Sequence, residues 1–288
     1  MRIFLLSHLK RRLARFDRVA RPWRALVVAF ALALTVAACE SDGEDAYVEQ
    51  PVEELYTSAH DAMLDGEFTT AAKGFDEVER QHPYSTWATR AQIMAAFCYY
   101  QDNDYDQAII AALRFAELHP GHPDAPYAYY LIAVSYYEQI SDIGRDQNAT
   151  LLALESLEEV TRRYPSTPYA KDAKLKLDLA RDHLAGKDME VGRFYLKRGE
   201  YIAAIGRFRR VIERYQTTSH APEALHRLAE AYVSVGLRQE AQTAAAVLGH
   251  NFPNSAWYRD SYALLEGVDL SPEGDKESWI SRAFNSVF

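Results

Sequence analysis

The sequence predicts an all-α fold, a right-handed superhelix of five helix–turn–helix repeats, and three observations lead to it. Five segments of the chain end in a similar way, and the shared end positions are Pro83, Pro120, Pro165, Gln216 and Pro253. Twelve residues before each end position stands an alanine, namely Ala71, Ala108, Ala153, Ala204 and Ala241. Seventeen residues before it stands a residue that favours turns, namely Gly66, Asn103, Asn148, Gly199 and Gly236.

A further spacing in the first half of each segment indicates that the units are helical. A small residue is followed three positions later by one that is large in four of the five units. These pairs are Ala59 and Ala62, Ala96 and Tyr99, Ala133 and Tyr136, Gly192 and Tyr195, and Ala229 and Tyr232. The small residue lets two helices approach, and the larger one fills the groove beside it. Gly or Asn then ends the first helix of a unit, and Pro ends the second.

A unit of this kind cannot bury its apolar face alone, so it must stack on its neighbours. The pattern resembles the tetratricopeptide repeat, which has a period of about 34 residues. The end positions here are 37, 45, 51 and 37 residues apart, so two units carry insertions. Extra residues of the third unit lie within 138–150, and the fourth unit begins with one long predicted helix over 169–198.

Residues 1–38, which precede the repeats, have the layout of an export signal. Eight Lys or Arg residues and one Asp stand before an uncharged apolar run at 25–38. Such a layout is typical of a secretory signal, and the run is shorter than the ~20 residues of a membrane-spanning helix. Val36–Cys39 resembles a bacterial lipobox, which predicts that lipid is attached to Cys39. The alternatives are an ordinary cleaved signal with a chance cysteine, or a buried helix.

Two further segments flank the predicted repeat domain, residues 52–265. Residues 39–51 are acidic and poor in apolar side chains, so we expect a flexible tether. Residues 266–288 read as a linker and an amphipathic helix capped by Ser278. Its apolar residues recur at helical spacing and are Trp279, Ile280, Ala283, Phe284, Val287 and Phe288. So short a helix is marginal alone in water, so its apolar stripe must find a surface.

Composition excludes several functions. Without residues 1–38 the chain keeps 24 of its 32 basic and 40 of its 41 acidic residues, a net charge of −16. This charge argues against nucleic acid and against anionic lipid surfaces as partners. Cys98 lies in an apolar run and is interpreted as a buried structural thiol. His119 and His122 lack a third ligand nearby, and no catalytic, metal or cofactor motif is found, so an enzyme is not expected.

Four tyrosines predict a binding groove. Tyr100, Tyr127, Tyr130 and Tyr137 fall at first-helix positions that face the concave groove in this repeat class. An aromatic groove can hold an extended or helical peptide. The competing interpretation is a solvated amphipathic face.

Lipobox, acidic tether and five repeats together resemble the BamD family, the lipoproteins of the outer-membrane β-barrel assembly machine. The resemblance covers residues 39–265. It is carried by ELYTSAHDAMLDGEF, RFAELHPGHPDAPYAYYLIAVSYYEQISDIGRDQ, RRYPSTPYAKDA and FYLKRGEYIAAIGRFRRVIERY. The resemblance implies a chain anchored through Cys39 at the periplasmic face of the outer membrane, and Glu40 after the cysteine agrees with that membrane.

The resemblance also implies partners. The C-terminal repeats would dock on POTRA domains of the insertase BamA, within a complex that holds other Bam subunits. The N-terminal repeats would offer the tyrosine groove to C-terminal signals of unfolded outer-membrane β-barrel proteins. Arg198 and Arg207 match the basic positions through which members of the family meet the last POTRA domain. The alternative is that Arg198 is an ordinary cation at a helix end and that Arg207 lies on a solvated helix face.

Other functions stay open on the sequence. One alternative is another periplasmic repeat lipoprotein, such as a pilotin for pilus secretin assembly or an adaptor for cell-wall hydrolases. An enzyme with a site built across repeats has no support in the residues. The segment after Leu265 departs from the family, and for its apolar helix we prefer docking on an accessory subunit to capping of the chain's own last repeat. Mimicry of a client signal fits its spacing poorly.

Overall fold

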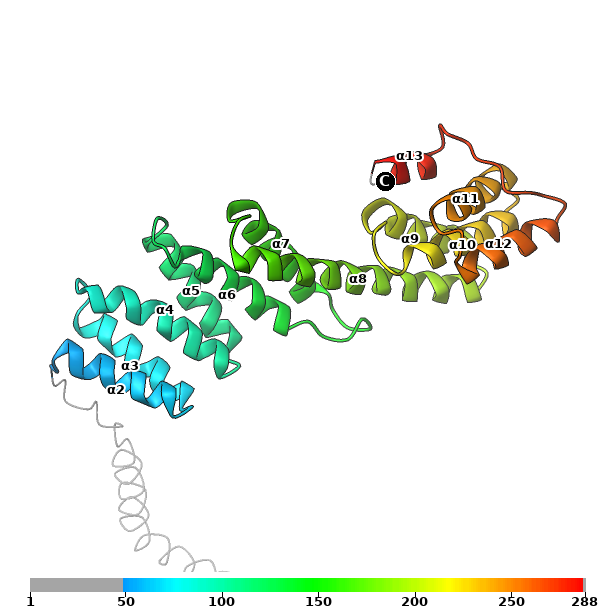
Figure 1. The fold of residues 1–288 in the computed structure, drawn as a ribbon. Coiled ribbons are helices and arrows are strands. Elements are labelled where there is room, and N and C mark those ends of the chain that lie inside the picture. Colours follow the sequence, from blue (N-terminus) through cyan, green and yellow to red (C-terminus); the bar gives the residue numbers. More distant parts are fainter. Residues whose placement is uncertain (1–48, 287–288) are drawn as a thin grey trace, which may run out of the picture. The chain divides into compact units, whose positions relative to one another are not determined.

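The computed structural model describes residues 49–286, which contain twelve helices and no strand (Figure 1). Ten of them form five helix pairs. The pairs are α2 (Val52–Leu64) with α3 (Phe68–Gln81), α4 (Thr86–Gln101) with α5 (Tyr105–Leu118), α6 (Ala125–Glu138) with α7 (Asn148–Arg163), α8 (Pro168–Lys197) with α9 (Tyr201–Arg214), and α10 (Ala221–Ser234) with α11 (Arg238–Asn251). The predicted all-α fold of five helix–turn–helix repeats is confirmed, as is the long helix that opens the fourth unit.

The pairs stack as the spacing predicts. Each second helix packs against its own first helix and against the first helix of the next unit. First helices also touch one another, as α2 touches α4 and α4 touches α6. The small residues of the predicted small–large pairs are buried in this packing, as Ala96, Ala133 and Ala229 show by being fully buried.

Turn residues behave as predicted in four units. Gly66, Gly199 and Gly236 have φ angles of 80°, 74° and 81°, and Asn103 has a φ of 62°. This left-handed conformation is accessible to Gly and, less easily, to Asn, and it lets the chain reverse between helices. The prediction is wrong for Asn148, which is the first residue of α7. The inserted residues 139–147 make that connection, so no single turn residue is needed.

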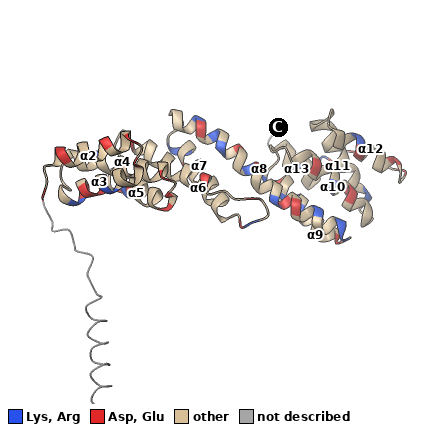
Figure 2. Ribbon diagram, turned by 90° about the horizontal axis from the view of Figure 1, so that it is seen from below, with Lys and Arg blue, Asp and Glu red and all other residues tan. Residues whose placement is uncertain are grey.

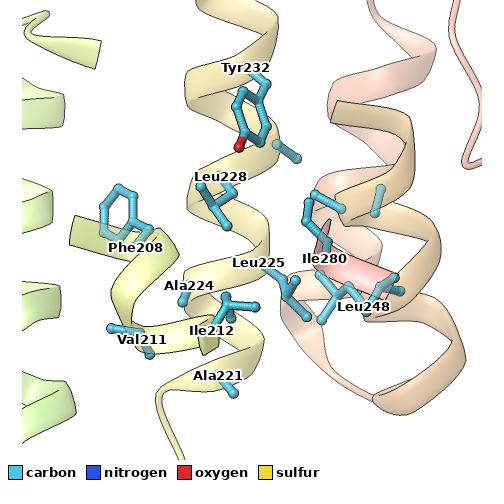
Figure 3. Close-up of a cluster of buried hydrophobic side chains, with 14 of the residues drawn as sticks. Phe208, Val211, Ile212, Ala221, Ala224, Leu225, Leu228, Tyr232, Leu248 and Ile280 are labelled. Atoms are coloured by element: carbon cyan, nitrogen blue, oxygen red, sulfur yellow. The ribbon is translucent and has the colours of Figure 1, made fainter. Parts of the chain in front are cut away.

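The largest apolar cluster joins the fourth and fifth units (Figure 3). Phe208 of α9 is fully buried beside Gly192 of α8, where an added Cβ would lie 2.4 Å from its ring. Leu225 and Leu228 of α10 and Leu248 of α11 continue the cluster. Glycine at 192 is therefore the residue that lets this aromatic side chain enter the interface between α8 and α9.

Two short helices follow the repeats. Helix α12 (Ala256–Glu266) packs on α10 and α11, as the first helix of a sixth unit would. Helix α13 (Trp279–Asn285) begins at the predicted cap, because the Ser278 hydroxyl accepts a hydrogen bond from the backbone N–H of Ser281 at 3.1 Å.

The structure contradicts our preference for docking of α13 on an accessory subunit. The side chains of Ile280 and Phe284 are 0% and 2% exposed because α13 packs on α9 and α11 of its own chain. The guanidinium of Arg209 on α9 lies 4.5 Å from the centroid of the Trp279 ring. The described part of the apolar stripe thus packs on the last repeats, and the structure supports the alternative of self-capping (Figure 1). Val287 and Phe288 lie outside the described residues.

Candidate functional site

The predicted groove tyrosines lie on α4 and α6, and all four are half-buried. Three of them meet α8. The ring centroids of Tyr127 and Tyr130 lie 5.4 Å and 5.2 Å from that of Tyr169. The Tyr130 hydroxyl donates a hydrogen bond to Asp172 at 2.6 Å. Lys176 places its ammonium 5.6 Å from the centroid of the Tyr137 ring.

Tyr100 lies at the other edge of the cluster. Its ring centroid is 5.9 Å from that of Tyr105, which opens α5. Burial raises the pKa of Tyr100, and the nearby carboxylate of Glu138 raises it further. Burial also raises the pKa of Tyr127 and of Tyr130, and for Tyr130 the hydrogen bond to Asp172 adds to the effect. Tyr100, Tyr127 and Tyr130 therefore present neutral phenol groups that can both donate and accept hydrogen bonds.

The carboxylate of Asp172 belongs to this site although the sequence did not single it out. Burial acts to raise its pKa, but the hydrogen bonds from Lys176 and Tyr130 outweigh that effect, so the pKa is lowered. Lys176 reaches Asp172 at 2.6 Å from one helical turn away. The result is a rim in which aromatic rings, an acid and an ammonium stand within one patch, a combination suited to a polypeptide with alternating aromatic and polar side chains.

Tyr169 was also missed, and a signal for it exists. Counted from the prolines that end three units, the fourth residue is aromatic each time, namely Trp87, Tyr169 and Trp257. All three open a first helix and pack on other aromatic or imidazole rings. This recurrent aromatic position lies in the first turn of a first helix, which packs on the preceding unit. Recognising it in the sequence would have predicted that Tyr169 lies beside the tyrosines of that unit.

The two predicted interface arginines come from the fourth unit, and each pairs with an acid of its own chain. Arg198 caps the end of α8, where its Nε donates to Glu200 at 2.9 Å and its guanidinium lies 5.3 Å from the Phe194 ring centroid. Arg207 on α9 donates to the Asp188 carboxylate at 3.1 Å. Arg210 donates to the same oxygen at 3.1 Å. The Asp188 side chain is only 8% exposed, so both arginines are anchored against α8.

Charge is distributed unevenly along the described helices (Figure 2). Residues 52–163, which form α2 to α7, hold seven Lys or Arg and 19 Asp or Glu. Residues 168–214, which form α8 and α9, hold 12 basic and seven acidic residues. We call this segment the basic centre of the chain. It attracts acidic surfaces, whereas the N-terminal repeats repel them.

The remaining residues considered for chemistry from the sequence are Cys98, His119 and His122, and each has a structural role or partner in the described part of the chain. Cys98 is buried, and burial raises the pKa of its thiol to about 12. The Nε2 of His119 lies 3.0 Å from the side-chain oxygen of Gln92, and the Nδ1 of His122 accepts from the backbone N–H of Asp124. Within residues 49–286 no three potential ligands gather as a metal site would require. Among the helices of that range, none is long and apolar enough to cross a bilayer. Cys39 lies outside the described residues.

Solved structures with a similar helical arrangement include tetratricopeptide-repeat proteins. A thermophilic TPR protein of Thermus thermophilus is 18% identical with a TM-score of 0.35, and the match covers 74% of this chain and 98% of that one. The TPR domain of P58(IPK) is 14% identical with a TM-score of 0.39, over 82% of this chain and 64% of the other.

Sequence relatives are much closer. A protein of Caulobacter vibrioides, described as outer membrane protein assembly factor BamD, is 51% identical over 249 residues, which are 85% of this chain and 82% of that one. A protein of Rickettsia prowazekii with the same description is 41% identical, over 82% of this chain and 94% of its own. The profile of the YfiO family, described as outer membrane lipoprotein, matches residues 48–248. The chain belongs to the YfiO family of outer membrane lipoproteins.

Proposed function

We propose that this chain is a lipid-anchored scaffold of the outer-membrane β-barrel assembly machine, held at the periplasmic face of the outer membrane through Cys39. The observation that carries the proposal is the 51% identity, over 85% of this chain, to a relative described as an outer membrane protein assembly factor. A repeat array without a catalytic constellation is suited to holding several polypeptides at once. Two surfaces are proposed to bind different partners, one on the basic centre and one at the tyrosine cluster.

The basic centre is proposed to dock on POTRA domains of BamA through Arg198 and Arg207. Arginine is enriched at protein interfaces, where its planar fork pairs with carboxylates. The Arg207 side chain is 34% exposed, so its guanidinium keeps surface available although Asp188 holds one of its nitrogens. Burial of Asp188 fixes the direction of the side chain, which reduces the entropy lost when a partner binds.

Arg207→Glu is expected to weaken copurification of BamA, with affinity lower by at least about tenfold, because the new charge opposes an acidic partner surface. The measurement is pull-down of BamA from detergent-solubilised envelopes, followed by titration with purified POTRA domains. The same substitution also places a second carboxylate beside Asp188, so the internal cost has to be separated from the lost contact.

Arg210→Glu is the matched control. Arg210 pairs with the same oxygen of Asp188 at the same distance of 3.1 Å, but it is not a proposed contact. Both variants lose one internal pair, and only Arg207→Glu should lose BamA. Equal retention of BamA by the two variants, at equal melting temperature, would remove Arg207 from the interface.

The tyrosine cluster is proposed to receive the C-terminal signals of unfolded outer-membrane β-barrel proteins. Such segments alternate aromatic and polar residues. Spaced aromatic pockets bind the alternate side chains of an extended peptide. The half-buried rings on α4 and α6 supply stacking surfaces, while Asp172 and Lys176 supply polar contacts at the rim.

Changing Tyr100, Tyr127 and Tyr137 together to Ala is expected to weaken binding of a synthetic C-terminal client peptide by about tenfold or more, because aromatic anchors carry most of the energy of such contacts. Fluorescence anisotropy with the labelled peptide measures the effect. The control exchanges Tyr84 and Tyr262, whose side chains are 101% and 43% exposed, for Ala. Unchanged peptide affinity in a triple variant that keeps its helical circular dichroism would place the client site elsewhere.

A further inference from the structure

The first half of α8 has the buried stripe of a repeat's first helix. At the fifth, eighth and twelfth positions after Pro165 stand Ala170, Ala173 and Leu177, which are 0%, 0% and 5% exposed. In α4, the same positions after Pro83 hold buried alanines, namely Ala88, Ala91 and Ala95. This stripe packs α8 onto α6 and α7, as the repeat spacing requires.

The same half of α8 lacks the second helix that would complete its unit. Thirteen residues after Pro83 and Pro120 stand Ala96 and Ala133, which are fully buried. Thirteen residues after Pro165 stands Asp178, whose side chain is 75% exposed. A charged residue at this position cannot pack closely on a second helix. Helix α8 instead runs on to Lys197, and its later half pairs with α9.

An apolar face of α8 is therefore left without a neighbour. Ten and fourteen residues after Pro83 stand Ile93 and Phe97, which join a cluster with residues of α6. The same two positions after Pro165 hold Leu175 and Leu179, one turn apart, and their side chains are 67% and 58% exposed. We call these two leucines the open face of α8. In a regular array the next first helix would cover them.

A cleft adjoins the open face. Its volume is about 670 Å³, and its apolar lining includes Leu179, Tyr137, Ile140 and Ile143. The charged residues Glu138, Asp142, Asp182 and Arg193 also line it. The insertion 139–147 forms one wall. The Lys187 ammonium donates to the Gly144 carbonyl at 3.1 Å, which ties the insertion to α8. The two departures from the regular repeat period thus meet at one place, and they leave room there for a large side chain.

The N-terminal end of the open face, away from the cleft, indicates the charge of an occupant at that end. The open face lies in the basic centre, and Lys171 and Lys174, both exposed on α8, stand four residues and one residue before Leu175, toward the N-terminal end of the open face. Neither lysine makes an ion pair within residues 49–286. Acidic residues beside an apolar stripe would complement them.

We propose that the open face of α8, with its cleft, binds an amphipathic helix of a partner protein. The helix carries apolar residues at 3–4 spacing and acidic residues toward Lys171 and Lys174. It packs where the first helix of a further repeat would pack, because the corresponding face of α4 is covered by a helix, α6. The site is separate from the arginines proposed for BamA, shares Tyr137 with the cluster proposed for client signals, and goes beyond the proposed function.

Photocrosslinking in intact envelopes tests the proposal. A benzoylphenylalanine replaces Leu175 or Leu179 in the full chain, and the attached peptide is identified by mass spectrometry. Control positions are Leu118 and Leu151, whose exposed leucines (57% and 51%) lie on α5 and α7. We expect a higher yield at 175 and 179 than at the controls, into a protein segment with 3–4 apolar spacing and acidic flanks. Yields equal to the controls, or products with lipid, a second copy of this chain or an extended client segment, overturn the proposal.

The identified segment is then made as a synthetic peptide. Leu175→Asp with Leu179→Asp should lower its affinity by at least about tenfold, because both side chains lose their apolar contact. Leu118→Asp with Leu151→Asp should leave the affinity unchanged. The peptide should gain helical circular dichroism on binding. Binding without helix formation, or equal affinity in the two double variants, would contradict a helix on the open face. BamA retention by the same variants reports separately on the proposed function.

Discussion

Phe208→Ala is expected to lower the free energy of unfolding of the fourth and fifth repeats by about 3–5 kcal/mol, the usual cost of removing a buried phenylalanine. The side chain is fully buried between α8 and the apolar cluster of α10 and α11. Gly192, which faces the Phe208 ring, has no side chain of its own that could fill the cavity. Urea unfolding followed by circular dichroism measures the loss.

A control on the same helix separates burial from helix propensity. The Ile202 side chain of α9 is 72% exposed, so Ile202→Ala should change the free energy of unfolding by no more than about 0.5 kcal/mol. A cost below about 1 kcal/mol for Phe208→Ala would mean that the interface repacks.

Gly192→Ala tests the contact from the other side. It should destabilise the natural chain, because its Cβ would lie 2.4 Å from the Phe208 ring. In the Phe208→Ala background the clash is gone, so the same change should be neutral or stabilising, since Ala favours helices by about 1 kcal/mol over Gly. Additive effects of the two substitutions would show that the residues do not interact.

Deleting residues 272–288 is expected to lower the melting temperature by about 5 °C while every partner is retained, because α13 is a cap of its own chain. The deletion uncovers the surface of α9 and α11 beneath Ile280 and Phe284. Each of these side chains contributes roughly 1.5–3 kcal/mol by burial, less the entropy of ordering the linker and helix. Differential scanning calorimetry measures the shift.

Hydrogen exchange locates the effect of that deletion. Faster exchange should be confined to α9, α11 and their neighbours, since repeat arrays respond locally. Arg282→Ala and Asn285→Ala, on the exposed side of α13, serve as controls. They change α13 without removing the buried side chains that pack on α9 and α11, so exchange should stay as in the natural chain. An unchanged melting temperature together with loss of an accessory subunit would restore partner docking as the role of α13.

Local patterns determined which parts of this chain are helical. Turn residues such as Gly66 and Gly236 act through their own φ angles, and Ser278 caps α13 through an N–H three residues away. The alternation of small and large residues sets helix contacts within one unit. Because these signals act over a few turns of chain, the amino-acid sequence alone predicts the order of helices, the long α8 and the tyrosines of α4 and α6.

Tertiary packing decided what each side chain meets. Arg207 is a surface cation by its sequence context, yet its partner Asp188 stands on another helix and is shared with Arg210. Tyr130 is joined to Asp172, which lies 42 residues further along the chain. Helix α13 packs on α9 and α11 of its own chain, far from it in sequence. The sequence by itself determined the periodic stripe on every helix, because a stripe depends only on helical geometry. Only the structure decided which stripes are covered, as at Ile280, and which stay open, as at Leu175, because coverage depends on segments that are distant in sequence and adjacent in space.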